Sequence, residues 1–157
     1  PSVAALFRKS YWVYVKREDV LRQAISRHMS IETKINHATK NDTDCHFAGN
    51  LLRGYTASYN ESARYDFQKI KRHCSNIVME NIIWANFFEV NKICPLTLTY
   101  EQLCSDGDFA YLNGIADFIG VDFQVDSGSF PRRQMVKLSN RKNDDWYFKF
   151  LADVNGL

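Results

Sequence analysis

The sequence has no strong excess of charge and little glycine or proline. Twenty lysines and arginines stand against 18 aspartates and glutamates, which gives a formal net charge of +2 over 157 residues. Such a balance argues against a general nucleic-acid binder or a membrane-surface protein. Seven glycines and three prolines are too few for a collagen-like, linker-like or low-complexity chain. With 45% hydrophobic residues, the composition predicts one globular domain over residues 1–157 with an ordinary apolar core.

Long hydrophobic runs and metal-binding cysteine motifs are also missing. No stretch approaches the ~18 uninterrupted apolar residues of a membrane-spanning helix, and the opening PSVAALF is too short for a signal peptide. We therefore expect a cytoplasmic protein without a transmembrane segment. The four cysteines are Cys45, Cys74, Cys94 and Cys104. They form no CxxC pair, so four reduced thiols and no metal are expected, the alternative being a zinc site where Cys45-His46 meets His73-Cys74.

The first regular segments are a strand followed by a helix. Residues 11–16 (YWVYVK) are aromatic and β-branched, which predicts a buried strand that Arg17 ends. Glu18 and Asp19 then place negative charge where a helix begins. Apolar residues at helical spacing predict that helix from Val20 to about Lys34. Strand, charged turn and helix make the first half of a βαβ unit.

The remaining pattern completes an α/β order. Residues 36–62 lose all periodicity and predict a long loop, and a helix returns near Arg64 with an aromatic core stripe at Trp84, Phe87 and Phe88. Pro95 opens a second strand, residues 96–100. A helix with N-cap Asp108 and C′ residue Gly120 follows, and a terminal helix is expected at residues 144–151. This order predicts a parallel sheet with helices packed against it.

The ends of the two strands carry the candidate site. Ligands of open α/β sheets bind outside the carboxyl ends of the strands. The first strand ends in a cation at Arg17, and the second ends in an aromatic ring at Tyr100. Ser26 in the following helix could reach the same anion as Arg17, and Arg132 with Arg133 forms a further anion clamp. These residues predict a nucleotide phosphate site.

Longer motifs run along most of the chain in a familiar order. They are KREDVLRQAISRHMSIETKINH at residues 16–37, RYDFQKI at 64–70, PLTLTYEQL at 95–103, IADFIGV at 115–121 and RRQMVKLSNRKNDDWYFKF at 132–150. In this order the chain resembles the bacterial sulfotransferases of the trehalose, lipopolysaccharide and nodulation-factor type. The resemblance covers nearly the whole sequence, so it is more specific than any single motif.

The resemblance implies a nucleotide-kinase-like, P-loop-type fold. It also implies transfer of a sulfuryl group from 3′-phosphoadenosine 5′-phosphosulfate (PAPS) to a hydroxyl of a carbohydrate or glycolipid, without a metal. Arg17 and Ser26 would hold the 3′-phosphate, Tyr100 would lie near the adenine, and Arg133 would close over the nucleotide. His37 is in register with the family and is expected on the acceptor side. The sequence assigns no catalytic base.

The sequence departs from the family pattern at two places. Glu18 stands where the family usually has a second arginine, so Arg17 precedes Ser26 by nine residues instead of the more usual eight. The family's phosphosulfate loop and acceptor-activating acid lie upstream of the matched segments, and only ten residues precede Tyr11. We therefore expect an N-terminally incomplete sulfotransferase domain, whose exposed core favours a homo-oligomer.

Two other functions fit the same residues. A non-catalytic nucleotide- or anion-binding module would keep the 3′-phosphate half of the site and lack turnover. A small interaction protein would use the basic segment near Arg132 and Arg133, with RNA as a partner. That last function predicts a steep salt dependence of RNA binding.

Overall fold

The computed structural model of the chain describes residues 3–7, 9–43, 49–105, 109, 111–123 and 135–156. The chain divides into two compact units. The first unit comprises Pro1–Glu18 and Val78–Pro131, and the second comprises Asp19–Ile77 and Arg132–Leu157. Each unit is thus built from two chain segments that lie far apart in the sequence. One boundary falls inside the long helix α3 (Phe67–Val90), which contributes residues to both units.

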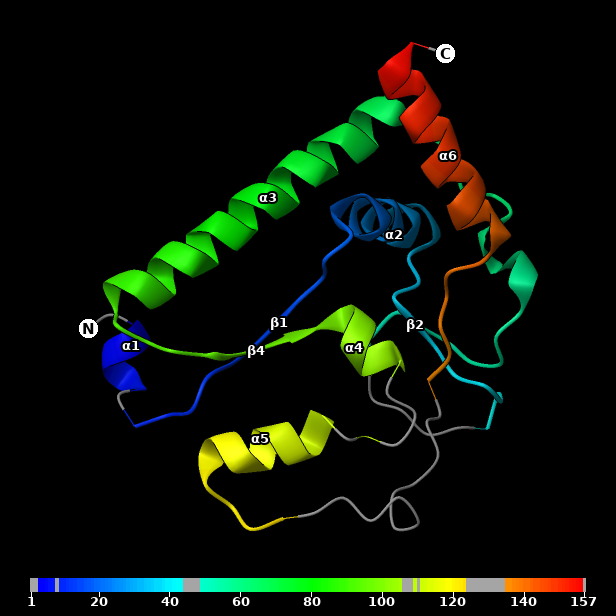
Figure 1. Cartoon of the computed structure of the whole chain (residues 1–157). Coiled ribbons are helices and arrows are strands. Elements are labelled where there is room, and N and C mark those ends of the chain that lie inside the picture. The colour runs from blue at the N-terminus through cyan, green and yellow to red at the C-terminus, as the bar shows by residue number, and fades with distance from the viewer. Residues whose placement is uncertain are drawn as a thin grey trace. The chain divides into compact units, whose positions relative to one another are not determined.

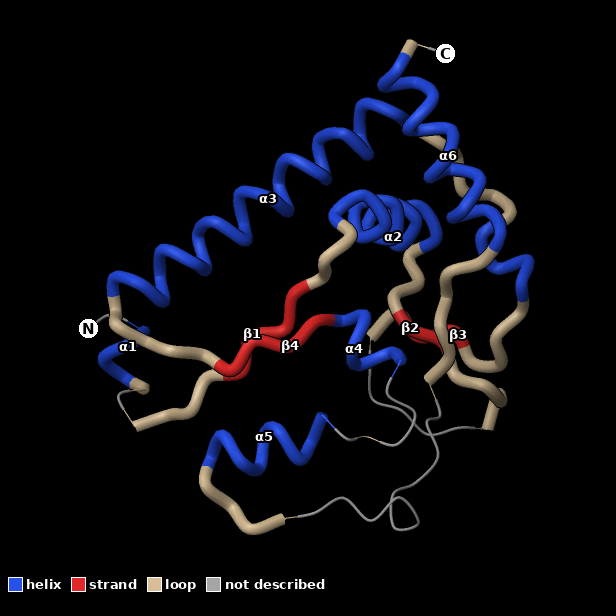
Figure 2. The backbone as a smooth tube through the Cα atoms, in the orientation of Figure 1, coloured by secondary structure: helices blue, strands red, loops and turns tan. Residues whose placement is uncertain are grey.

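The first unit contains a pair of parallel strands. Its elements are α1 (Val3–Leu6), β1 (Val13–Lys16), the second half of α3, β4 (Leu96–Thr99), α4 (Tyr100–Ser105) and α5 (Tyr111–Ile119). Figure 2 shows β1 and β4 side by side. In their register, Val13 lies opposite Leu96 and Lys16 opposite Thr99. The predicted parallel pairing is confirmed. Both strands therefore end at the same edge of the sheet.

Strand β1 is more exposed than its sequence predicts. Val13 is 41% exposed and Val15 is 50% exposed. Side chains alternate between the two faces of a strand, and here Tyr14 points to α3, where its hydroxyl donates to Asn81 Oδ1 at 3.0 Å. The prediction of a buried strand was wrong, because the described part of this unit covers only one face of β1.

The aromatic stripe of α3 is only partly in the core. Phe88 is 8% exposed and its ring lies 5.4 Å from that of Tyr14 and 6.1 Å from that of Trp12. Trp84 stacks on Phe88 at 5.7 Å but remains 44% exposed. The core prediction holds for Phe88 and fails for Trp84, which packs against the cluster from its rim.

Strand β4 turns directly into a helix that the sequence analysis did not predict. Thr99 Oγ1 accepts a hydrogen bond from Gln102 N–H at 3.1 Å, and Gln102 Oε1 accepts one from Thr99 N–H at 3.0 Å. This reciprocal pair is a capping box, so Tyr100 begins α4 instead of ending a strand. Helix α5 ends as predicted at Gly120, which has a positive φ of 72° that glycine adopts more easily than other residues. The N-cap expected at Asp108 lies outside the described residues.

The second unit is built around helices α2 and α6. Its elements are α2 (Val20–Thr33), β2 (His37–Ala38), β3 (Leu51–Leu52), the 3₁₀ helix η1 (Ala57–Asn60), the first half of α3 and α6 (Arg141–Asn155). Helix α2 begins as predicted, because the Asp19 carboxylate accepts from Arg22 N–H at 2.8 Å. Helices α2 and α6 are in contact (Figure 1). The core between these elements consists of Ala24, Ile25, Met29, Ala63, Ile70, Ile77, Trp146 and Phe150.

The segment expected as one long loop contains short regular pieces. Strands β2 and β3 pair in parallel, with His37 opposite Leu51. Thr39 N–H donates to Leu52 O at 3.0 Å, and Tyr55 N–H donates to Thr39 O at 2.9 Å. Backbone hydrogen bonds hold these pieces, so no hydrophobic period marks them in the sequence. The loop prediction was wrong for this part of residues 36–62.

The last helix is longer than predicted because both of its ends are capped. Asn140 accepts from Lys142 N–H at 3.1 Å and takes part in a capping box with Asn143. Gly156, with φ of 69°, ends the helix in the left-handed conformation. Asn140 also exchanges side-chain hydrogen bonds of 3.1 Å with Asn60, which is 2% exposed.

We expect Asn140→Ala to lower the free energy of unfolding by about 1–2 kcal/mol, because it removes a helix cap and leaves the buried Asn60 amide without this partner. Urea denaturation of both proteins measures the difference. Asn155→Ala, at an exposed position at the other end of α6, is the matched control and should change stability by less than ~0.5 kcal/mol. Equal effects of the two substitutions would contradict the role of the cap.

Candidate functional site

The carboxyl edge of the first unit's sheet brings Arg17 and Tyr100 into contact. Because Lys16 pairs with Thr99, the next residue of each strand emerges at the same place. The guanidinium carbon of Arg17 lies over the Tyr100 ring, 4.6 Å from its centroid. This is a cation–π contact. Two residues predicted separately for a nucleotide site are therefore neighbours.

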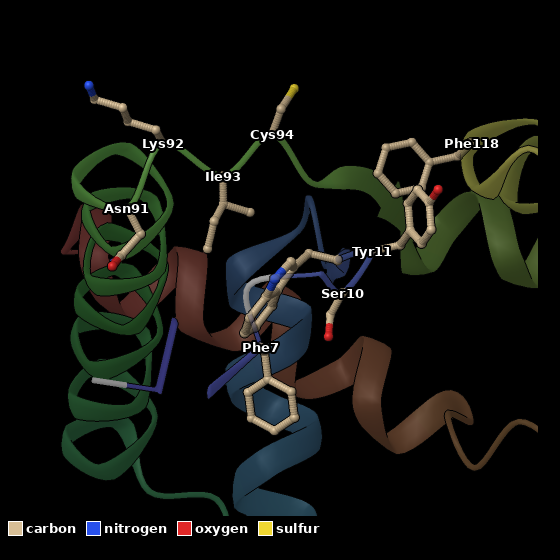
Figure 3. Close-up of a pocket in the computed structure, with 9 residues that line it drawn as sticks. Phe7, Ser10, Tyr11, Asn91, Lys92, Ile93, Cys94 and Phe118 are labelled. Carbon is tan, nitrogen blue, oxygen red and sulfur yellow. The ribbon is translucent and has the colours of Figure 1, made fainter. Parts of the chain in front are cut away.

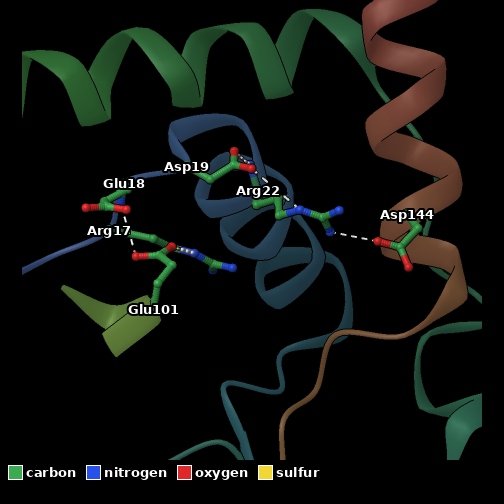
Figure 4. A network of polar contacts seen from close by, with 6 residues as sticks. All are labelled: Arg17, Glu18, Asp19, Arg22, Glu101 and Asp144. Atoms are coloured by element: carbon green, nitrogen blue, oxygen red, sulfur yellow. Dashed lines mark hydrogen bonds and ion pairs between the residues drawn. The ribbon is translucent and has the colours of Figure 1, made fainter. Parts of the chain in front are cut away.

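Glu101 holds the same arginine from the side. Its Oε1 accepts from Arg17 Nε at 3.3 Å, and its Oε2 accepts from the backbone N–H of Glu18 at 3.1 Å (Figure 4). Partial burial works against ionisation of Glu101, but the Glu18 N–H and the Arg17 guanidinium outweigh it and lower its pKa. Glu101 is thus a carboxylate at neutral pH. The Arg17 side chain is only 17% exposed in this setting.

The Tyr100 hydroxyl remains protonated at neutral pH. Burial is the main cause that raises the pKa of Tyr100, and the neighbouring Cys104 and Glu101 raise it further, whereas Arg17 lowers it. A neutral phenol keeps an ordinary aromatic face beneath the guanidinium. The edge therefore offers one oriented cation and one neutral ring.

The other predicted residues lie in the second unit or outside the described residues. Ser26 is exposed on α2 and lines a cavity of about 30 Å³ together with Ser30, Asn36, Tyr59 and Asn143 among others. That volume suits a water molecule and is smaller than a phosphate group. His37 is exposed in β2. Arg132 and Arg133 lie outside the described residues. Since Arg17 and Ser26 belong to different units, their joint role at one phosphate remains a prediction.

A comparison of the sequence with models of known protein families shows the family to which the chain belongs. The model of the Stf0 sulphotransferase family matches residues 2–153. The chain belongs to this family. The resemblance that the motifs carried is thereby confirmed. No curated protein and no solved structure matches the chain.

In this Stf0 sulphotransferase, a second arginine close in sequence has a different setting. Arg22 donates to Asp144 Oδ1 at 2.7 Å and lies 3.5 Å from Asp19 Oδ2 (Figure 4). Its guanidinium carbon also lies 4.7 Å from the centroid of the Tyr147 ring. The hydrogen bond to Asp144 is the main cause that raises the pKa of Arg22. Two carboxylates offset its charge, so Arg22 joins α2 to α6 and is a poorer anion ligand than Arg17.

The first unit of this sulphotransferase also has a larger cavity at the opposite edge of the sheet. Its volume is about 440 Å³, and Figure 3 shows the side chains that line it. Residues just before β1 and just before β4 line it, among them Phe7, Tyr11, Trp12 and Ile93, with Phe118 of α5. The Tyr11 and Phe118 rings lie 5.7 Å apart. The sequence analysis did not find this cavity, because its aromatic residues were assigned to the strand and the core.

The described part of the chain was also compared with the expectations for a metal site, a membrane-spanning helix and free thiols. No group of three or more histidine, cysteine or acidic side chains there could hold a metal ion. None of the helices in the same residues is both long and apolar enough to cross a membrane. Cys74 is half-buried and Cys94 and Cys104 are exposed, all as free thiols. The zinc alternative involves Cys45, which is outside the described residues.

Glu101 is the site residue that sequence reasoning missed. The sequence analysis gave it no role. The signal was the spacing of Thr99 and Gln102, which is the T-x-x-Q pattern of a capping box. That pattern predicts a helix that begins at Tyr100. It therefore places Glu101 in the first turn of this helix, directly after the end of the strand.

Proposed function

We propose that this chain transfers a sulfuryl group from PAPS to a hydroxyl of a carbohydrate or glycolipid. Membership of the sulphotransferase family supports sulfuryl transfer. The observation that supports a nucleotide as the ligand is the contact of Arg17 with the Tyr100 ring, at the edge where two parallel strands end. Such an edge is the usual ligand site of α/β sheets.

In this proposal the Arg17 guanidinium binds the 3′-phosphate of the nucleotide, and the Tyr100 ring lies near the adenine. Ser26 adds a hydroxyl to the same phosphate, Arg133 covers the nucleotide, and His37 contacts the acceptor. An arginine next to an aromatic ring suits a nucleotide because a guanidinium matches phosphate geometry and a ring stacks on a base. The two units then belong to one P-loop-type sulfotransferase domain over residues 1–157.

The chemical step forms one bond and breaks one. The acceptor oxygen attacks the sulfur of PAPS while the bond from sulfur to the 5′-phosphate oxygen breaks. Adenosine 3′,5′-bisphosphate leaves with the electron pair, and the hydroxyl proton passes to a base. As in phosphoryl transfer, positioning and charge neutralisation carry most of such a reaction. No metal takes part in the proposed step.

Calorimetric titration with adenosine 3′,5′-bisphosphate tests the nucleotide site without any acceptor. AMP, which lacks the 3′-phosphate, is the control ligand. Tighter binding of the bisphosphate than of AMP is the expected result. Equal affinities, or no binding by a folded chain, would refute the 3′-phosphate site and with it the proposed donor.

Transfer itself is tested by incubating the chain with PAPS labelled in the sulfuryl group and a panel of mono- and disaccharides. Labelled sugar is the expected product. Selective nucleotide binding without labelled product from any hydroxyl compound would favour the alternative, a nucleotide-binding module that lacks turnover. Binding to RNA that weakens steeply with salt would favour the interaction protein instead.

We expect Ser26→Ala to weaken binding of the bisphosphate by about 1 kcal/mol, roughly fivefold, because one hydrogen bond to a charged phosphate is lost. AMP binding should stay the same, and calorimetry measures both ligands. Ser75→Ala, at an exposed serine of α3, is the control and should alter neither affinity. An unchanged bisphosphate affinity in Ser26→Ala would remove Ser26 from the site.

A further inference from the structure

We propose that Glu101 is a positioning residue that orients the Arg17 guanidinium toward an incoming phosphate. This inference rests on the proposed function, since it assumes that Arg17 binds the nucleotide. Glu101 does not touch the nucleotide in this account. It acts through Arg17, by fixing the direction in which the arginine presents its donors.

The contact pattern leaves the phosphate-binding side of the arginine available. Glu101 Oε1 engages Nε of Arg17, which is the nitrogen nearest the side-chain stem. Among the described residues, Arg17 makes its hydrogen bond and ion pair through Nε and not through its two Nη groups. Figure 4 shows the Nη end of the guanidinium directed away from the Glu101 carboxylate. Bidentate binding of a phosphate needs two parallel N–H donors, and the two Nη groups can supply such a pair.

The carboxylate is itself held in place. Its second oxygen, Oε2, accepts from the backbone N–H of Glu18 at 3.1 Å. This hydrogen bond therefore joins Glu18 to Glu101 across the ends of the two strands. A carboxylate fixed at one oxygen by backbone gives Arg17 a rigid partner at the other.

The Tyr100 ring supplies the second restraint. With the guanidinium carbon 4.6 Å from the ring centroid, the ring limits movement on one face, and Glu101 limits rotation at Nε. An unrestrained arginine side chain loses conformational entropy when a ligand immobilises it. Restraint before binding lowers that cost, which is preorganisation.

Simple charge repulsion predicts the opposite role for Glu101. A carboxylate beside a phosphate site disfavours an anion, so neutralising it would strengthen nucleotide binding. Here both carboxylate oxygens already accept hydrogen bonds, one of them from a cation. These donors offset its charge locally. Positioning therefore outweighs repulsion, and the two accounts differ in the sign of one measurement.

The test compares Glu101→Gln with Glu89→Gln, which removes the same charge at an exposed position of α3 in the first unit. By calorimetry, Glu101→Gln should bind adenosine 3′,5′-bisphosphate about tenfold more weakly, a size typical of coupling between contacting residues. AMP affinity should not change, and Glu89→Gln should match the unaltered chain for both ligands. A general folding defect would weaken AMP binding as well.

A double variant separates this inference from the proposed function. In an Arg17→Ala background, Glu101→Gln should cause no further loss of bisphosphate affinity, because Glu101 acts only through Arg17. Equal or tighter binding by Glu101→Gln alone, with Arg17→Ala still weakening binding, would overturn the positioning role and leave the nucleotide site standing. No effect of Arg17→Ala would refute the proposed site itself. Should Glu101→Gln not fold, Glu101→Asp keeps the charge but shortens the reach to Arg17, and the same loss is expected.

Discussion

Replacing Trp146 by alanine is expected to lower the free energy of unfolding by about 3–5 kcal/mol, the range for large aromatic residues in a core. Trp146 is 6% exposed, and its ring lies 5.6 Å from the His28 ring and 5.8 Å from the Tyr65 ring. The substitution empties the space between α2 and α6. It also uncovers His28, which is 1% exposed and bonded through Nε2 to Arg64 O at 3.0 Å.

Urea denaturation measures this loss, and the same helix provides its control. Phe148, two residues further along α6, is 66% exposed. Phe148→Ala removes an aromatic ring of comparable size from the surface and should change stability by about 0.5 kcal/mol or less. Trp146→Phe retains part of the packing and should lie between the two. If both alanine variants had the same free energy of unfolding, Trp146 would not be a core residue of the second unit.

Arg17→Ala is expected to weaken binding of adenosine 3′,5′-bisphosphate by about 2–3 kcal/mol, roughly 30-fold to 150-fold. The substitution removes the charged donors that the proposal assigns to the 3′-phosphate. Calorimetry with the bisphosphate measures the effect.

The neighbouring residue gives the matched control for this prediction. Lys16→Ala removes the same charge one position earlier in the chain, at the exposed last residue of β1. It should lower bisphosphate affinity by no more than about twofold, through the loss of long-range attraction alone. A loss as large as that of Arg17→Ala would mean that general charge, and not the orientation at the strand edge, attracts the nucleotide.

Much of the fold follows from local chemistry that the sequence displays. Asp19 marks the start of α2 because a short acidic side chain caps a helix N-terminus, and Gly120 marks the end of α5 because it adopts positive φ. The alternation of strands and helices was enough to predict that β1 and β4 run parallel. From that pairing the meeting of Arg17 with Tyr100 follows.

Other features depend on contacts that no local pattern specifies. The ion pair of Arg17 with Glu101 joins residues 84 positions apart. The exposure of Val15 and Trp84 depends on what packs over the strand or helix face that carries them. Their residue types indicate only that both side chains are apolar. Strands β2 and β3 have two residues each and are held by backbone atoms, which every sequence possesses. For such features, hydrophobic periodicity carries no information.

The parallel pairing of β1 with β4 also constrains the order in which the polypeptide can assemble during translation. At a ribosomal rate of about 5–20 residues per second, the 84 positions from Arg17 to Glu101 correspond to roughly 4–17 s. Helices α2 and α3 are both synthesised entirely within that interval. Strand β1 therefore waits for the segment that completes its sheet, and the carboxyl edge of that sheet cannot form before β4 is synthesised. A nascent chain stalled before β4 would contain the arginine without Tyr100 or Glu101 to orient it.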